Sequence, residues 1–404
     1  KGLVYSMGIQ EEAMKLHRVN NGKLSVASKV DLKDGHDLSL VYTPGVAAPC
    51  EAIEKDKDLS FDYTCRGNMV AVISDGTRVL GLGNIGPEAG LPVMEGKAVL
   101  YKTFADIDAI PLCLDTTDTK KFVETVRYLQ PNFAGINLED IESPKCYDIE
   151  DELQKIMDIP VFHDDQHGTA IACTAAVLGA MRLMKKDIHE ARIIVNGAGA
   201  AGTAIARLLL HVGAGNVTML NSKGAMYEGM DMSRINRVQA ALLTDTNREK
   251  KQGKLAEIAV GADVLIGVSV PGAFTPEIIQ KMRPDPVVLS LCNPVPEISY
   301  AAAKAAGAKV VGTGRSDTPN QVNNVLVFPG LFRGAIDVRA REINDEMKLA
   351  AAYAIADLIP DDELREDYVI PDVFNPRTAR AVAAAVAKAA IKSGAARTGM
   401  PVYS

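Results

Sequence analysis

Residues 192–211, RIIVNGAGAAGTAIARLLLH, decide the fold. A short run of β-branched residues leads into Gly197, Gly199 and Gly202, which have the G-x-G-x-x-G spacing, and an apolar helical pattern follows. The first glycine permits a tight turn, the second lets a pyrophosphate approach the backbone, and the third lets the helix pack closely on the strand. Because a helix N-terminus also offers N–H donors to phosphate, the segment predicts a dinucleotide site that includes Ala200 and Ala201.

The residues after the next predicted strand bear on the choice of dinucleotide. An acidic residue there would bind the ribose hydroxyls of NAD, but this chain has the neutral Asn221, followed by Ser222 and Lys223. Hydroxyl and ammonium groups are donors that suit a 2′-phosphate, so we predict NADP slightly in preference to NAD. The alternative is that this segment is only a turn after a strand.

The glycine loop belongs to a longer series of alternating strands and helices. Apolar runs at 192–195, 217–220, 263–266, 287–291 and 309–311 are each bounded by Gly, Pro or Asn and separated by helical patterns. Five such strands predict a Rossmann-like, doubly wound sheet.

A second, shorter series precedes it. Apolar runs at 69–73, 109–114, 133–138 and 160–162 predict a small, mainly parallel sheet, so the fold class is α/β. The pattern at 169–184 is apolar on all sides, which predicts a helix buried between the two halves.

These two series predict two domains. We place an N-terminal catalytic domain at 1–165 and the dinucleotide-binding domain at 166–404. The second includes C-terminal helices from about residue 335, broken near Pro360 and Pro371.

Composition excludes several classes of protein. The net charge is 44 − 51 = −7, no basic block occurs, and aromatic residues make up 5% without any Trp, so we expect no nucleic-acid partner. No apolar stretch reaches about 18 residues, and residues 1–18 lack a continuous apolar segment, so we expect no membrane span and no signal peptide. The six cysteines lack C-x-x-C spacing, which favours reduced thiols, a cytoplasmic location and no zinc site.

Paired acids close two neighbouring strands of the first series: Glu139 and Asp140, and Asp164 and Asp165. Because carboxyl ends of parallel strands meet at one sheet edge, these acids should gather and repel one another unless a cation binds. Oxygen ligands favour Mg²⁺ or Mn²⁺. The alternative is that the pairs are helix caps or solvated acids. His163 and His167 flank the second pair and are expected to be hydrogen-bonding neighbours rather than ligands.

Seven motifs stand in order along the chain: YTPGV at 42–46, DGTRVLGLGNIGPEAGLPVMEGK at 75–97, LED at 138–140, HDDQHGTA at 163–170, NGAGAAG at 196–202, CNP at 292–294 and NNVLVFPG at 323–330. Together they resemble the malic enzyme family, in particular its short microbial branch, over roughly residues 40–337. Any one of these motifs would be modest evidence, but all seven in the family's order are specific.

The resemblance implies a role for each matching residue. Tyr42 resembles the general acid and Lys97 the general base, which must be neutral to accept a proton. Asp164 resembles an acid that supports the catalytic network. The implied metal ligands are Glu139, Asp140 and Asp165, and the implied substrate-binding residues are Arg78, Asn293 and Asn324, with Asn323 nearby.

The implied reaction is oxidation of L-malate at C2 by NAD(P), followed by loss of CO₂ from oxaloacetate to give pyruvate. Two alternatives stay open: a malolactic or oxaloacetate decarboxylase with no net redox change, and a non-catalytic dinucleotide sensor. The family is commonly oligomeric, so we expect a homo-oligomer, with a dimer favoured.

Overall fold

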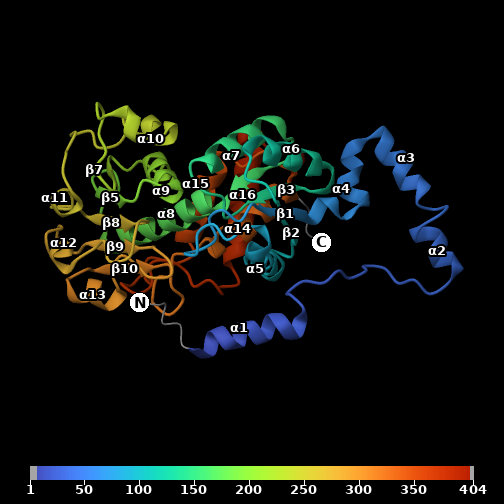
Figure 1. Cartoon of the computed structure of the whole chain (residues 1–404), viewed down its shortest axis with the longest axis horizontal. Coiled ribbons are helices and arrows are strands. Elements are labelled where there is room, and N and C mark those ends of the chain that lie inside the picture. Colours follow the sequence, from blue (N-terminus) through green and yellow to red (C-terminus); the bar gives the residue numbers. More distant parts are fainter. Residues whose placement is uncertain (1–6, 401–404) are drawn as a thin grey trace.

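The computed structural model of the chain describes residues 7–400. Residues 1–6 and 401–404, which include the start of the N-terminal segment and the outer ends of both predicted domains, lie outside the described residues. Two β-sheets stand side by side, and helix α8 (Asp164–Met184) leads from one to the other (Figure 1). The predicted α/β fold class is confirmed.

The first sheet is parallel, with strand order β2-β1-β3-β4. Its strands are β1 (Met69–Ser74), β2 (Asp108–Cys113), β3 (Gly135–Leu138) and β4 (Val161–His163). Val70 pairs with Ala109 on one side and with Gly135 on the other. The four predicted apolar runs are thus confirmed to within two residues at each end, because strands buried on both faces are apolar along their length.

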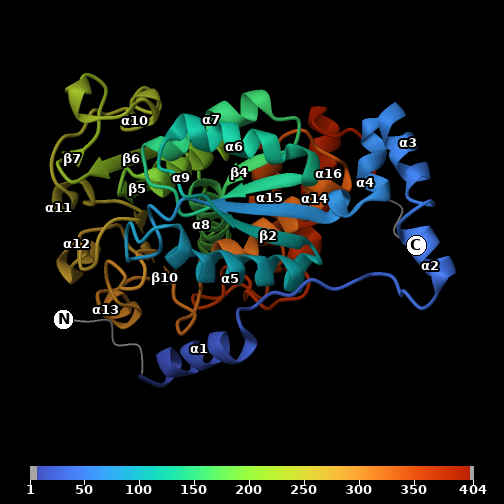
Figure 2. The same ribbon diagram turned by 45° about the vertical axis from the view of Figure 1, so that its right-hand side comes forward.

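Helices cover both faces of this sheet (Figure 2). They are α5 (Pro87–Ala105), α6 (Thr119–Leu129) and α7 (Lys145–Ile156). Helix α5 packs along β1 and β2, and α6 packs on α7. In α6 the buried residues Phe122, Val123 and Val126 follow the spacing of one helix face.

The second sheet has the order β10-β9-β8-β5-β6-β7. Its strands are β5 (Arg192–Asn196), β6 (Asn216–Asn221), β7 (Gly224–Ala225), β8 (Val264–Gly267), β9 (Val287–Ser290) and β10 (Val310–Thr313). The intervening helices are α9 (Ala200–His211), α10 (Arg237–Ala241), α11 (Leu255–Ile258), α12 (Pro276–Gln280) and α13 (Tyr300–Ala305). This order reverses direction at β5, as in a doubly wound dinucleotide-binding sheet. The sequence did not predict β7, a two-residue antiparallel strand formed by the turn after Asn221.

Helix α8 begins at Asp164, five residues before the predicted start at 169. Asp164 and Asp165 therefore occupy its first turn, where the helix dipole favours negative charge. By length and composition α8 could cross a membrane, but 67% of its most apolar window is buried inside the protein. It packs on α9 and α15, which agrees with the predicted buried helix.

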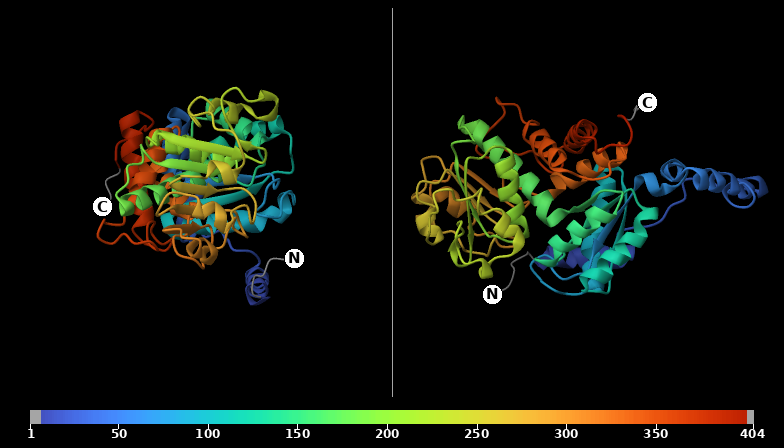
Figure 3. Two further views of the ribbon diagram at one scale, coloured as in Figure 1. Left: turned by 90° about the vertical axis from the view of Figure 1, so that its left-hand side faces the viewer. Right: turned by 90° about the horizontal axis from the view of Figure 1, so that it is seen from above.

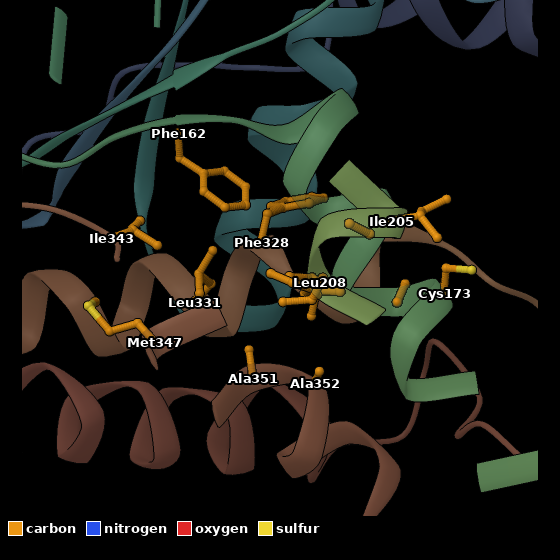
Figure 4. Packing of buried hydrophobic residues seen from close by; sticks show 14 of the residues in the cluster. Phe162, Cys173, Ile205, Leu208, Phe328, Leu331, Ile343, Met347, Ala351 and Ala352 are labelled. Carbon is orange, nitrogen blue, oxygen red and sulfur yellow. The ribbon is translucent and has the colours of Figure 1, made fainter. Parts of the chain in front are cut away.

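The C-terminal helices return to the first sheet (Figure 3). They are α14 (Phe328–Asp337), α15 (Asp345–Ala356) and α16 (Thr378–Ser393). The Phe328 and Phe332 rings of α14 lie 4.6 and 5.6 Å from the ring of Tyr101 on α5, and Phe332 also contacts Phe162 of β4. Figure 4 shows this packing around Phe162, Phe328 and Leu331. The division of the chain at 165 and 166 stays a prediction.

Residues 24–60, which we call the N-terminal arm, project from the first sheet on the side away from the second (Figures 1 and 3). The arm follows α1 (Met7–Asn20) and contains α2 (Gly35–Val41), α3 (Ala47–Lys55) and the short helix η1 (Lys57–Leu59). It leads through α4 (Ser60–Tyr63) and η2 (Cys65–Asn68) into β1. Neither α2 nor α3 has a buried residue.

Candidate functional site

One cleft of roughly 780 Å³ lies between the two sheets, at the carboxyl ends of their strands. Ligands of open α/β sheets bind at this edge. The sequence-predicted residues that line the cleft are Arg78, Lys97, Glu139, Asp140, Asp165, Gly199, Ala200, Ala201, Asn293, Asn323 and Asn324. The cleft thus brings the acids of the first half together with the glycine loop of the second.

Three carboxylates form a compact group in this cleft. Glu139, Asp140 and Asp165 each offer an oxygen within 4.8 Å of the others. Asp140 follows β3 with a left-handed backbone (φ 54°), and its N–H donates to Asp165 Oδ2 at 2.8 Å. This bond ties the end of β3 to the first turn of α8. The acids therefore meet because two adjacent parallel strands end at the same edge.

The negative charges of these three carboxylates are not fully balanced by the groups around them. Asp140 Oδ2 is buried without a hydrogen-bond partner. Burial, with added repulsion from Asp165, raises the pKa of Asp140 to about 9, and burial raises the pKa of Glu139 to about 7 against the attraction of Lys97. A hard divalent cation would satisfy the unpartnered oxygen and stabilise the ionised acids, so these residues fit Mg²⁺ or Mn²⁺.

Lys97 lies beside this group. It is 7% exposed on α5, its Nζ lies 3.0 Å from Glu139 Oε1, and it also contacts Asp164 Oδ2. The Phe328 ring covers the ammonium at 4.1 Å. Burial opposes the charge, but attraction and hydrogen bonds from Asp164 and Glu139 outweigh it and raise the pKa of Lys97 above its ordinary value.

Asp164 is fully buried behind Lys97. Burial raises the pKa of Asp164, and Lys97 partly offsets this effect. The side-chain amide of Asn324 donates to the same Oδ2 that Lys97 contacts. Two donors therefore fix the orientation of the carboxylate.

Sequence reasoning missed several residues that support the acids. Tyr101 donates from its hydroxyl to Asn137 Oδ1 at 2.7 Å, and Asn137 Nδ2 donates to Glu139 Oε2 at 2.8 Å. Both side chains are buried, so this relay orients Glu139 in a place without solvent. The signal in the sequence was a polar residue, Asn137, inside an apolar strand. It was not sufficient for a prediction, because its partner Tyr101 is distant in sequence.

A second missed residue is Glu150 on α7. It accepts from the His163 N–H at 2.9 Å and from Gln166 Nε2 at 3.0 Å, and His167 Nε2 lies 3.0 Å from it. Burial works against ionisation of Glu150, but the attraction and hydrogen bonding of His167, together with nearby groups such as Lys348, outweigh it and lower the pKa of Glu150 to about 2. The two histidines are thus neighbours of acids, as predicted, and neither belongs to the three-carboxylate group.

The glycine loop has the geometry that its sequence requires. Gly197 has φ 117°, and a Cβ on Gly202 would lie 1.7 Å from the Gly197 carbonyl oxygen, so only glycine fits at both positions. A Cβ on Gly199 would have no atom within 4 Å, because this residue faces the cleft. The loop leads directly into the N-terminus of α9.

Three other predicted residues have polar contacts or positions at the cleft. The Arg78 N–H donates to the Asp140 carbonyl at 3.0 Å, which joins the DGTR turn to the acids. Asn323 Oδ1 accepts from the Val325 N–H and caps the short helix η5 (Asn324–Leu326). Asn293 lies beside Gly314 at the end of β10.

Besides the buried Asp164 and two of the loop glycines, two predicted sets lie outside the cleft lining. Asn221 Oδ1 accepts from the Lys223 N–H at 2.9 Å, so this segment does form a turn, with Ser222 exposed within it. Tyr42 is 68% exposed on the N-terminal arm and does not line the cleft. The chain therefore brings together every predicted catalytic, metal and substrate residue except Tyr42.

Comparisons with known proteins agree with this geometry. Family models described as "Malic enzyme, N-terminal domain" and "Malic enzyme, NAD binding domain" match residues 21–154 and 166–391. The chain is 56% identical to the bifunctional malic/malolactic enzyme of Bacillus subtilis, over 97% of this chain and 95% of that protein. It is 49% identical to an NAD-dependent malic enzyme of Geobacillus stearothermophilus, over 93% of this chain and 78% of that protein.

A solved structure gives the same result. The crystal structure of a malic enzyme from Pyrococcus horikoshii matches with a TM-score of 0.93 and 47% identity, over 97% of this chain and 93% of that chain. Other similar proteins are named as NADP-dependent malic enzymes, so both dinucleotides occur among relatives. With both halves matched and the cleft between them carrying the acids and the glycine loop, this chain belongs to the malic enzyme family.

Proposed function

We propose that this chain catalyses the oxidative decarboxylation of L-malate to pyruvate and CO₂, with NAD or NADP as hydride acceptor. One observation carries the proposal: a single cleft joins the carboxylate group at the end of the first sheet to the glycine loop of the second. A hydride acceptor and a hard-metal site can therefore contact one small substrate.

Residues of both halves would hold the cofactors. Glu139, Asp140 and Asp165 would bind the metal, and residues 197–202 would bind the dinucleotide pyrophosphate. When bound, the metal polarises the substrate carbonyl and the nicotinamide accepts the hydride.

Lys97 is the proposed base for the 2-hydroxyl proton. Its position at the cleft wall, beneath the Phe328 ring, supports this role. Without a metal, Asp164 and Glu139 raise the pKa of Lys97 and keep it charged. A dication held by Glu139 would offset part of that attraction and favour the neutral amine that a base requires. Asp164 is not one of the proposed metal ligands, so it stays hydrogen-bonded to Lys97. Its carboxylate stabilises the ammonium that forms when Lys97 takes the proton, and this keeps the proton close to the substrate. Asn324 keeps Asp164 in that orientation.

The substrate carboxylates need donors at the cleft wall. Arg78 is suited to a bidentate contact with one of them, and Asn293, Asn323 and Asn324 offer amide donors nearby. Tyr42 is the proposed acid that protonates C3 of the enol formed after CO₂ leaves.

The test follows absorbance at 340 nm with L-malate, Mn²⁺ and either NAD or NADP, with and without EDTA, and measures pyruvate by a separate assay. We expect pyruvate and reduced dinucleotide in equal amounts, and no product with EDTA. Lys97→Ala should lower turnover by roughly 10²- to 10⁴-fold while Mn²⁺ and dinucleotide still bind. Near-normal turnover of this variant would remove Lys97 from the mechanism.

A second candidate is a malolactic activity, conversion of malate to lactate without net redox change. It is favoured by the similarity to a relative named as bifunctional. Lactate formed without lasting absorbance at 340 nm would identify it. Dinucleotide binding without release of CO₂ would instead indicate a sensor.

We propose NADP slightly in preference to NAD, since Asn221 removes an acid after the second strand of the sheet, and Ser222 and Lys223 are donors that suit a 2′-phosphate. A cytoplasmic location is supported by six free thiols, two of them fully buried.

A further inference from the structure

A buried chain of polar contacts lies behind the three-carboxylate group. It runs from Glu150 on α7 through Gln166 in the first turn of α8 and His163 at the end of β4 to Asp165, a proposed metal ligand. Glu150, Gln166 and His163 are each at most 5% exposed. Since water cannot replace a missing partner in such a place, each donor should face an acceptor, and the contacts then indicate where the protons are.

Glu150 determines how the Gln166 amide is oriented. Glu150 Oε1 accepts from the His163 backbone N–H at 2.9 Å, and Oε2 lies 3.0 Å from Gln166 Nε2. Despite burial, attraction from His167 and its neighbours lowers the pKa of Glu150, so the carboxylate is ionised at neutral pH and can only accept. The other orientation of the amide would place its carbonyl oxygen against a carboxylate oxygen, so the NH₂ group must face Glu150.

Gln166 in turn determines the tautomer of His163. The same Nε2 lies 2.9 Å from His163 Nδ1, and an amide NH₂ group can only donate. Nδ1 is therefore the acceptor, and the proton of the neutral ring is on Nε2. Burial lowers the pKa of His163, but hydrogen bonding and attraction from Asp165 outweigh burial and raise it. A second proton would have to sit on Nδ1, where it would face the Gln166 N–H and be repelled.

The proton on His163 Nε2 lies next to one of the acids of the cleft. Nε2 is 3.2 Å from Asp165 Oδ2, and in the described part of the chain no other group offers it a hydrogen bond. The Asp140 backbone N–H donates to the same Oδ2 at 2.8 Å. Two N–H groups thus face Oδ2, whereas no hydrogen bond from residues 7–400 reaches Oδ1. This arrangement leaves Oδ1 as the oxygen of Asp165 that a cation can take.

We propose that His163 is a positioning residue of the metal site: its Nε2–H holds Asp165 Oδ2 and keeps Oδ1 available for the metal. This inference rests on the proposed function, which makes Asp165 a ligand. Because Nε2 carries the proton, His163 has no free lone pair on that side and does not coordinate the metal itself. Hydrogen-bonding partners of this kind orient metal ligands, and their loss typically lowers metal affinity about 10- to 100-fold.

The first test determines the tautomer in the metal-free enzyme. Histidine labelled with ¹⁵N at Nδ1 alone is incorporated, and solid-state NMR spectra are recorded at pH 8. The chain has six histidines, so the His163 signal is identified as the one that disappears in His163→Gln. We expect a pyridine-type Nδ1, which has no bonded proton. A pyrrole-type Nδ1, from the other tautomer or from the imidazolium, would overturn the proposal.

The second test measures Mn²⁺ affinity by calorimetry, without substrate or dinucleotide. His163→Leu removes the donor, and we expect the affinity to fall about 10- to 100-fold. His163→Gln keeps an N–H donor near the position of Nε2, and the Asp165 carboxylate selects the orientation in which this amide donates. His163→Gln should therefore recover most of the lost affinity. Equal affinity of His163→Leu and the wild type, or an equal loss in both variants, would overturn the proposal.

The matched control is His211→Leu. His211 is the last residue of α9, is partly exposed and lies 3.6 Å from Asp345, so its loss should leave Mn²⁺ affinity unchanged. A loss as large as that of His163→Leu would show that the effect is not specific to His163 and would overturn the proposal.

Neither test needs malate, so this inference can fail separately from the proposed function. A wild-type enzyme that binds no Mn²⁺ rejects the metal site and the role of His163 together. An enzyme that binds Mn²⁺ but forms no pyruvate fails the proposed function, while the order of affinities among the variants still decides the role of His163.

Discussion

Replacing Lys97 by Met tests whether a buried cation holds the acid cluster in its folded arrangement. Lys97 is nearly fully buried and contacts Asp164, which has no solvent exposure. Removing one partner of a buried ion pair leaves the other charge uncompensated and costs about 3–5 kcal/mol of unfolding free energy. We expect a loss of this size at pH 8 in EDTA.

The loss should depend on pH with a definite sign. Without Lys97, the folded-state pKa of Asp164 lies still further above its unfolded value, since burial raises it and the opposing ammonium is gone. The folded variant therefore takes up a proton that the unfolded chain lacks, so stability falls as the pH rises. As the pH falls from 8 to 5, the difference in unfolding free energy between the wild type and Lys97→Met should shrink by up to ~1.4 kcal/mol per pH unit.

Urea unfolding followed by circular dichroism measures both effects. The matched control is Lys102→Met on the same helix, because Lys102 is half-exposed and pairs with Asp106 and Asp108 at the surface. Exposed pairs contribute about 0–1 kcal/mol, so this variant should lose little. Equal losses for Lys97→Met and Lys102→Met at pH 8, or a gap that does not change with pH, would refute the reasoning.

Three further perturbations have defined outcomes. Mn²⁺ affinity in calorimetry should rise from pH 6 to pH 9 with proton release, because the raised pKa values of Asp140 and Glu139 make metal compete with protons, and Asp140→Asn should leave only the part due to Glu139, at lower pH; affinity that ignores pH would contradict this. Gly202→Ala should lose about 1–3 kcal/mol in thermal unfolding, since its Cβ would overlap the preceding carbonyl, whereas Gly199→Ala, with open space around its Cβ, should unfold like the wild type. Glu150→Gln should flatten the fall in stability between about pH 4.3 and pH 2, because a carboxyl with a lowered pKa stabilises the fold above its unfolded pKa and loses that contribution on acidification; an unchanged acid-unfolding curve would rule out this role of Glu150.

Local sequence patterns were sufficient to predict the two sheets and to predict that the acids lie close together. Apolar runs such as 69–73 predicted strands because parallel strands are buried on both faces. Parallel strands then place their carboxyl ends at one edge, which is why the acids after β3 and β4 meet. The glycine spacing likewise determined the loop, since Gly202 has no room for a side chain.

Contacts between distant segments could not be predicted in this way. The relay from Tyr101 through Asn137 to Glu139 joins a helix to a strand 36 residues later, and no periodicity marks that pairing. The predicted start of α8 is five residues too late. The sequence pattern places Asp164 and Asp165 at the end of a strand, although acids also suit the first turn of a helix. The position of Tyr42 depends on the arm's direction, which the motif YTPGV does not encode.

The return of α14 to the first sheet has a consequence for synthesis of the chain. The rings of Tyr101 and Phe162 are covered by Phe332, which is translated long after β4 is complete. A nascent chain on the ribosome therefore has an open apolar face on its first sheet while the glycine-loop half emerges. Chaperone binding should be strongest in that interval and should end when residues 328–337 leave the exit tunnel.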